Sequence, residues 1–167
     1  DMTTGSLGQG ASTAVGIALA RKMQGKSNYT YLILGDGECQ EGQVWEAAMF
    51  AAHRKLDNLC LLIDNNGLQI DGKISEVCSP YPIDEKFRAF GFHVIVINGH
   101  NFDEIEAAYE EAKTVKGKPT AIISLSTKGK DVTFMEDRVE WHGAAPNEEQ
   151  YQIAMNDLNA ILNSIKE

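Results

Sequence analysis

The sequence predicts an α/β fold, in which a single domain over residues 1–167 forms a parallel sheet with helices on both faces. Short apolar runs alternate along the chain with amphipathic segments of helical period. The runs at 29–34 and 59–63 are each followed by Gly, Asp or Asn, as strands are where they enter a loop. A length of 167 residues, with 43% hydrophobic and 23% charged residues, suits one globular domain.

The first half of the chain supplies two helices and two strands. Residues 8–23 repeat their apolar side chains at helical spacing, which predicts the first helix. Residues 29–34 (Tyr-Thr-Tyr-Leu-Ile-Leu) and 59–63 (Leu-Cys-Leu-Leu-Ile) are short apolar runs that predict buried strands. A second helix is expected between them, over 43–55. Because strands and helices alternate, the strands should run parallel.

The second half continues this alternation after a loop through Pro80 and Pro82. The expected elements are a short helix over 83–90, a strand over 93–97, a helix from about Asp103, a strand over 121–125 and a last helix over 148–165. The two strands are His-Val-Ile-Val-Ile and Ala-Ile-Ile-Ser-Leu, which are mostly apolar. The last helix has apolar residues in phase at Tyr151, Met155, Leu158 and Leu162.

Charge and cysteine content exclude several classes of function. The net charge of −9 argues against nucleic acid or an anionic membrane as a partner. The residues given contain no apolar run near the length of a membrane span, and we expect no signal peptide. Cys39, Cys60 and Cys78 are odd in number and lack metal-binding spacing, so we expect unpaired thiols and a cytoplasmic protein.

Two polar motifs follow the first two predicted strands. Gly35-Asp36-Gly37 closes the first strand and Asn65-Asn66 closes the second, with residues 38–64 between them. Either motif alone would be an ordinary turn. Together they place the Asp36 carboxylate, the Asn66 amide oxygen and the following backbone carbonyls at the edge of the sheet where ligands bind. A few hard oxygen donors suit Mg²⁺.

The same motifs favour a bulky anion beside the metal. Gly35 and Gly37 let the backbone approach a ligand closely. The helix at 43–55 points its N-terminus toward this edge, and helix N-termini favour negative charge. The residues therefore predict a site for a diphosphate bridged to the protein by a metal ion.

The spacing of these two motifs resembles the signature of thiamine-diphosphate enzymes, and the surrounding sequence resembles transketolase. The stretches that carry the likeness are Asp1–Gly10, Glu41–Met49, His53–Leu59, Leu68–Gly72 and Trp141–Pro146. They span nearly the whole chain, from Thr3 to about Pro146. The resemblance is greatest to the N-terminal half that split transketolases encode as a separate subunit.

The resemblance implies thiamine diphosphate and Mg²⁺ as cofactors, with Ca²⁺ as a substitute metal. It implies transfer of a two-carbon ketol unit from a ketose phosphate to an aldose phosphate, the chemistry of the pentose phosphate pathway. Asp36, Asn66 and the backbone carbonyl of Leu68 would be the metal ligands. The amides of Gly35 and Gly37 would face the diphosphate.

Further site residues also follow from the resemblance. Gly5 and Leu7 match loop residues beside the aminopyrimidine and thiazolium rings, and Ile70 matches an apolar contact to the thiazolium, although a core position would suit it nearly as well. Glu41 matches a glutamate in an interface network between two cofactor sites, or is simply an acid in the first turn of a helix. His142 matches a histidine near the diphosphate and substrate; a structural or solvated role is its alternative. Glu41 and His142 are the catalytic candidates.

The resemblance also implies a partner. The glutamate that activates the aminopyrimidine belongs to the pyrimidine-binding domain, and this chain offers no candidate for it. We therefore expect a C-terminal transketolase subunit to complete the site in a dimer or heterotetramer, and the isolated chain to be inactive. Because Asp1 opens inside a family motif, we expect an N-terminal segment to be missing.

Three other readings remain open at this point. The chain could be half of another thiamine-diphosphate enzyme, similar to deoxyxylulose-phosphate synthase or to a 2-oxoacid dehydrogenase E1 subunit. It could be an inactive truncated module that binds metal and diphosphate weakly. It could also be a different phosphate-binding α/β protein, although neither G-x-G-x-x-G nor GxxxxGK[ST] occurs in it.

Overall fold

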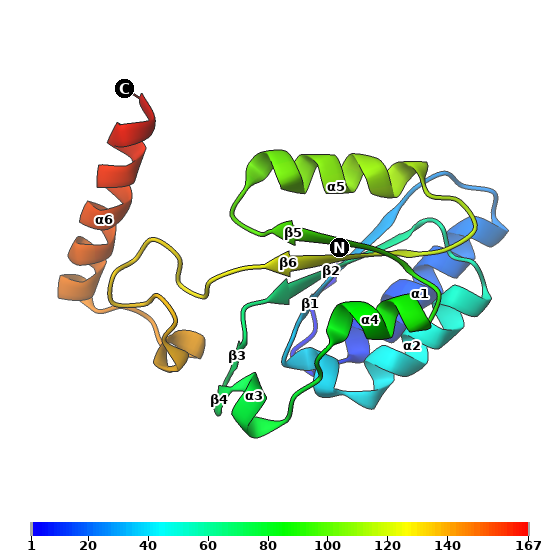
Figure 1. The fold of residues 1–167 in the computed structure, drawn as a ribbon, viewed down its shortest axis with the longest axis horizontal. Coiled ribbons are helices and arrows are strands. Elements are labelled where there is room, and N and C mark those ends of the chain that lie inside the picture. The colour runs from blue at the N-terminus through cyan, green and yellow to red at the C-terminus, as the bar shows by residue number, and fades with distance from the viewer. Residues whose placement is uncertain (1, 167) are drawn as a thin grey trace.

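The computed structural model describes residues 2–166 and confirms the α/β fold with a parallel sheet (Figure 1). The four strands lie in the order β1 (Thr30–Gly35), β2 (Leu59–Asn65), β6 (Thr120–Leu125) and β5 (His93–Asn98). All three neighbouring pairs are parallel. Gly35 pairs with Asp64, and Leu125 pairs with both Asn65 and Asn98. This register aligns the carboxyl ends of the strands along one edge.

Helices cover both faces of the sheet, as predicted, but unequally (Figure 1). One face packs against α1 (Gln9–Met23), α2 (Gly42–His53) and α4 (Ile83–Ala89). The other face packs against α5 (Phe102–Thr114), which begins where the Asn101 side chain accepts hydrogen bonds from Asp103 N and Glu104 N. Since α5 lies over β2, β6 and β5, Tyr31 and Ile33 of β1 stay exposed on that face.

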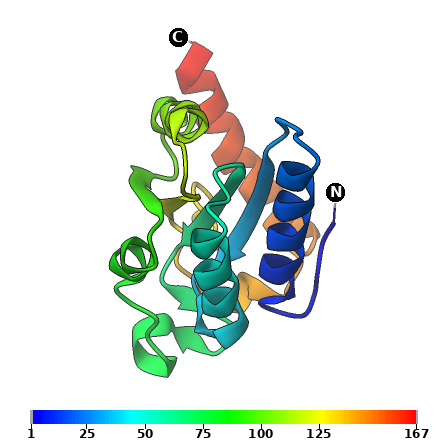
Figure 2. The same cartoon turned by 90° about the vertical axis from the view of Figure 1, so that its right-hand side faces the viewer.

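The larger part of the core lies between the sheet and the paired helices α1 and α2, which lie side by side in Figure 2. The helices meet through small side chains, all of them buried: Ala11, Ala14, Ala18, Ala47, Ala48 and Ala51. Leucine and isoleucine residues of β1 and β2 fill the space beneath them. Alanine lets the two helices approach closely, which sets the start of α2 beside the start of α1.

The segment between β2 and α4 was expected to be a loop, and this expectation is wrong in part. It contains a short hairpin, β3 (Leu68–Gln69) and β4 (Gly72–Lys73), followed by a one-turn helix α3 (Ile74–Val77). Each element is too short to show a period in the sequence. The chain turns at Gly72, whose φ of 138° is a backbone conformation that suits glycine, and buries Ile74.

Three further elements complete the fold: the 3₁₀ turns η1 (Glu38–Gln40) and η2 (Val139–His142), and the last helix α6 (Glu148–Lys166). In Figure 1, α6 stands away from the sheet. Its in-phase residues Tyr151, Met155, Leu158 and Leu162 are exposed, because nothing in the described part of the chain covers them. Within residues 2–166, no helix is long and apolar enough to cross a membrane.

Two isoleucines of the sheet, one buried and one exposed, can test which side of each strand faces the core. Ile63 of β2 is fully buried, whereas Ile33 of the neighbouring β1 is 70% exposed. We expect Ile63→Ala to lower the free energy of unfolding by about 2 to 5 kcal/mol, because it leaves a cavity. Ile33→Ala should cost less than about 1 kcal/mol. Denaturant unfolding of both variants measures the difference, and equal costs would contradict this description of the core.

Candidate functional site

The candidate site is built around the Asp36 carboxylate, which is 1% exposed directly after β1. Its Oδ1 accepts a hydrogen bond from the Gly37 amide at 2.9 Å. Its Oδ2 accepts one from the Gly67 amide at 2.6 Å and one from the Tyr81 hydroxyl at 3.1 Å. The bond from Gly67 brings the turn after β2 against the end of β1, so the two sequence motifs meet.

Burial has a cost for this carboxylate. Desolvation raises the pKa of Asp36, and the negative charge of Asp64 raises it further. The three hydrogen bonds from Gly67, Tyr81 and Gly37 oppose this rise without cancelling it. A cation beside Asp36 would favour the ionised form, which is the electrostatic condition expected of a metal ligand.

Asn66 is held in place from both ends of its amide. Its Oδ1 accepts a hydrogen bond from the Leu68 amide at 3.0 Å, and its Nδ2 donates to Asp64 Oδ2 at 3.1 Å. Asp64 is held in turn by the hydroxyl of Ser126, in the loop after β6. Asn66 Oδ1 keeps one lone pair for a further partner.

These oxygens fit a hard divalent cation. No cluster of three or more His, Cys, Asp or Glu side chains in residues 2–166 is arranged to hold a metal. A metal at this edge would therefore take a mixed set of oxygens, from the Asp36 carboxylate, the Asn66 amide and the backbone. Leu68, expected to contribute its carbonyl, lies half-buried in β3 just beyond Asn66. Such a set, completed by water and phosphate oxygens, is the coordination that Mg²⁺ favours.

The two glycines of the first motif have different surroundings. A Cβ atom at Gly37 would lie 3.0 Å from Cβ of Gln69, so any other residue here would push β3 slightly away. The Gly35 amide donates to Glu38 Oε2 at 3.3 Å, and the Gly37 amide donates to Asp36. Both amides therefore have acceptors within the chain, and a diphosphate facing them would have to replace those acceptors.

Glu38 is not among the site residues predicted from the sequence, but the structure shows that its carboxylate makes two contacts at this edge of the sheet. Its Oε1 accepts a hydrogen bond from the Gly8 amide at 2.8 Å, while Oε2 faces Gly35. Glu38 therefore ties the loop before α1 to the end of β1. The signal in the sequence was only an acid directly after Gly35-Asp36-Gly37, which is too common to single out.

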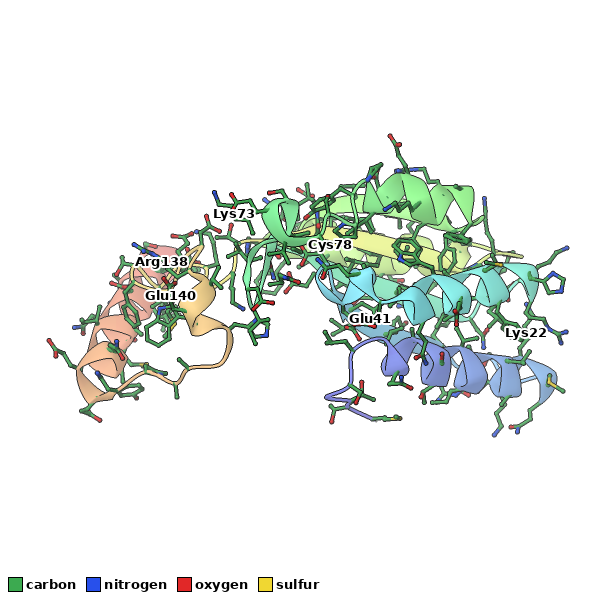
Figure 3. All side chains as sticks on the ribbon, turned by 90° about the horizontal axis from the view of Figure 1, so that it is seen from below. Lys22, Glu41, Lys73, Cys78, Arg138 and Glu140 are labelled. Carbon is green, nitrogen blue, oxygen red and sulfur yellow. The ribbon has the colours of Figure 1, made fainter. Side chains whose placement is uncertain are left out.

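The loop anchored by Gly8 carries two of the predicted cofactor contacts. Gly5 and Leu7 are both exposed in it, and Leu7 lines a groove of about 660 Å³ along the edge strand β1. Glu41, the N-cap residue of α2, is exposed beside this loop, and a Cβ atom at Gly8 would lie 3.1 Å from its Cβ. Figure 3 shows Glu41 at the opposite end of the paired helices from Lys22.

The remaining predicted residues, Ile70 and His142, lie on the hairpin side of the site. Ile70, in the turn between β3 and β4, is 65% exposed and therefore not a core residue of the described chain. His142 is exposed in η2, which packs against β3. The neighbouring Trp141 fixes this turn by donating to the Phe134 carbonyl at 3.0 Å. Both residues thus lie on the side of the sheet where the strands end, without a described bond to Asp36.

Known proteins are similar to this chain in sequence and in fold. Residues 1–159 match the family described as the thiamine diphosphate binding domain of transketolase. The chain is 50% identical over 158 residues to the 6-deoxy-6-sulfo-D-fructose transketolase subunit SqwG of a Clostridium species, covering 95% of this chain and 58% of that protein. It is 39% identical to an apulose-4-phosphate transketolase subunit of Phocaeicola vulgatus, covering 99% and 59%.

The fold is likewise similar to solved structures. A transketolase from Campylobacter jejuni superposes with a TM-score of 0.85 at 38% identity, over 92% of this chain and 25% of that one. The chain spans a little under three fifths of the length of the two curated relatives. By its sequence and by its fold, the chain belongs to the transketolase family and is a thiamine-diphosphate-binding domain of it.

Proposed function

We propose that the protein is the diphosphate- and metal-binding half of a split transketolase, which transfers a two-carbon ketol unit from a ketose phosphate to an aldose phosphate. The observation that carries the proposal is the 2.6 Å hydrogen bond from Gly67 to Asp36. In a chain of this family, it joins two oxygen-bearing motifs at the edge of the sheet where ligands bind. Two relatives named as transketolase subunits support the split arrangement.

Different residues of the site would bind the metal, the diphosphate and the rings of the cofactor. Asp36, Asn66 and the Leu68 carbonyl would hold Mg²⁺ or, as a substitute, Ca²⁺. The N-terminus of α2 would favour the negative diphosphate, which is needed in a chain of net charge −9. Gly35 and Gly37 leave room at the backbone, and Gly5, Leu7 and Ile70 would contact the rings. When bound, thiamine diphosphate supplies an electron sink for the ketol transfer.

Two exposed residues have proposed roles beyond binding. His142, on the turn beside β3, would donate a hydrogen bond to the diphosphate or move a proton at the substrate. Glu41, at the start of α2, would join an interface network between two cofactor sites. Both residues are exposed, so their side chains can meet a ligand or a partner.

A partner protein would complete this site. We propose a C-terminal transketolase subunit with a pyrimidine-binding domain, which supplies the activating glutamate, in a dimer or heterotetramer. The unpaired cysteines, two buried and one exposed, are in keeping with a cytoplasmic enzyme. The relatives' names suggest two donors to compare, a sulfo sugar and a sugar phosphate.

Reconstitution tests the proposed activity directly. A pyrimidine-binding transketolase subunit and this protein are assayed separately and together, with thiamine diphosphate and Mg²⁺. Ketol transfer from a ketose phosphate or from 6-deoxy-6-sulfo-D-fructose to an aldose phosphate is followed by product analysis. We expect turnover only in the mixture, because neither half contains the whole site. Turnover by this protein alone would contradict the split site, and cofactor binding without turnover in the mixture would favour a non-catalytic module.

The Asp36 assignment predicts a loss of metal-dependent binding. We expect Asp36→Asn to weaken Mg²⁺-dependent binding of thiamine diphosphate by at least about 100-fold, because it removes the charged ligand. Calorimetric titration of the reconstituted assembly measures this affinity. Asp103→Asn, in the exposed first turn of α5, is the matched control and should bind like the parent. Equal affinities for Asp36→Asn and the parent would refute the assignment.

The role given to His142 predicts a different pattern. We expect His142→Ala to lower kcat about 10-fold or more while changing the affinity for thiamine diphosphate less, because a proton donor or shuttle acts mainly in the reaction. Steady-state kinetics from pH 6 to 9 and calorimetry separate the two effects. His53→Ala, at the exposed end of α2, provides the comparison. A kcat equal to that of the parent across this range would leave His142 with a structural role.

A further inference from the structure

Tyr81, in the loop before α4, touches the candidate metal site without being a ligand candidate itself. Its hydroxyl oxygen lies 3.1 Å from Asp36 Oδ2 and 2.8 Å from Asn65 Oδ1. The contact with Asp36 joins residues 45 positions apart in the sequence. A tyrosine hydroxyl carries its proton near neutral pH, so Tyr81 can act as a hydrogen-bond donor here.

The hydroxyl of Tyr81 has one proton to donate, and Asp36 is the better acceptor for it than Asn65. A phenol donates one hydrogen bond, and both neighbouring oxygens are acceptors. An ionised carboxylate is the stronger acceptor of the two. With the amide of Asn65 turned so that its NH₂ donates to Tyr81, both contacts are satisfied at once. In that orientation Asn65 would hold Tyr81 in place, and the Tyr81 hydroxyl would donate its proton to Asp36 Oδ2.

This arrangement leaves the two carboxylate oxygens of Asp36 unequal. Oδ2 accepts from Gly67 at 2.6 Å and from Tyr81 at 3.1 Å, which uses both of its lone pairs. Among residues 2–166, Oδ1 accepts only from Gly37, at 2.9 Å, and so keeps one lone pair. While Tyr81 is in place, a metal ion can therefore bind Asp36 through Oδ1 but not through Oδ2.

We propose that Tyr81 is a positioning residue that restricts Asp36 to one-oxygen coordination and so selects the metal. The inference rests on the proposed function, in which Asp36 is a metal ligand. Mg²⁺ requires six ligands in near-ideal octahedral geometry, which a single carboxylate oxygen suits. Ca²⁺ accepts six to eight oxygens and readily binds a carboxylate through both. By occupying Oδ2, Tyr81 favours Mg²⁺ over Ca²⁺.

The test compares the two cations in Tyr81→Phe, which removes the hydroxyl and keeps the ring. Mg²⁺ and Ca²⁺ are each titrated by calorimetry into the reconstituted assembly with thiamine diphosphate present. We expect the ratio of Mg²⁺ to Ca²⁺ affinity to fall about tenfold, the effect of one hydrogen bond to a charged group. Thermal unfolding without ligands checks that the variant is folded.

Tyr29→Phe is the matched control, since it removes a hydroxyl that donates to the Lys113 carbonyl at 3.0 Å beside the opposite end of β1. Its affinity ratio should equal that of the parent. An unchanged ratio in Tyr81→Phe, or an equal loss of both affinities, would overturn the role of Tyr81 alone. If the parent assembly binds neither cation with thiamine diphosphate, the proposed function fails, and the role of Tyr81 fails with it.

Discussion

The site depends on a carboxylate that the fold buries at the end of a strand. Asp36 is 1% exposed, and its oxygens accept from Gly37, Gly67 and Tyr81, which lie on three separate stretches of chain. These bonds offset only part of the desolvation that raises its pKa. The domain thus buries a carboxylate where its charged form is costly, and a cation beside it would favour that form.

The surrounding architecture serves to hold this edge together. The parallel register aligns the strand ends, and Glu38 joins Gly8 to Gly35. Gly37 lets the β3–β4 hairpin approach so closely that a Cβ atom there would lie 3.0 Å from Cβ of Gln69. The alanine-lined contact of α1 with α2 then sets Glu41 beside the loop that carries Leu7. Stability and site geometry are therefore provided by the same contacts.

Much of this was predictable from the sequence because it follows from local patterns. The alternation of strands and helices, the parallel sheet and the meeting of Asp36 with the Asn66 turn all come from short motifs at strand ends. The roles of Tyr81 and Glu38 could not be predicted in this way. Tyr81 bonds to Asp36, 45 positions away, and Glu38 bonds to Gly8, 30 positions away, and no local sequence pattern indicates such distant contacts. The hairpin at 68–73 was missed because two-residue strands have no period.

The cysteines make one part of this site accessible to spectroscopy. Burial raises the pKa of Cys39 and of Cys60 to about 12, so neither thiol ionises appreciably near neutral pH. Cys78, labelled in Figure 3, is exposed. Its carbonyl accepts a hydrogen bond from Gln40 at 2.5 Å, which holds the start of the loop that carries Tyr81. A fluorophore or spin label coupled to the native protein would therefore go to Cys78 without mutagenesis. It would sit three residues from Tyr81 and report how that loop responds when the cofactor arrives.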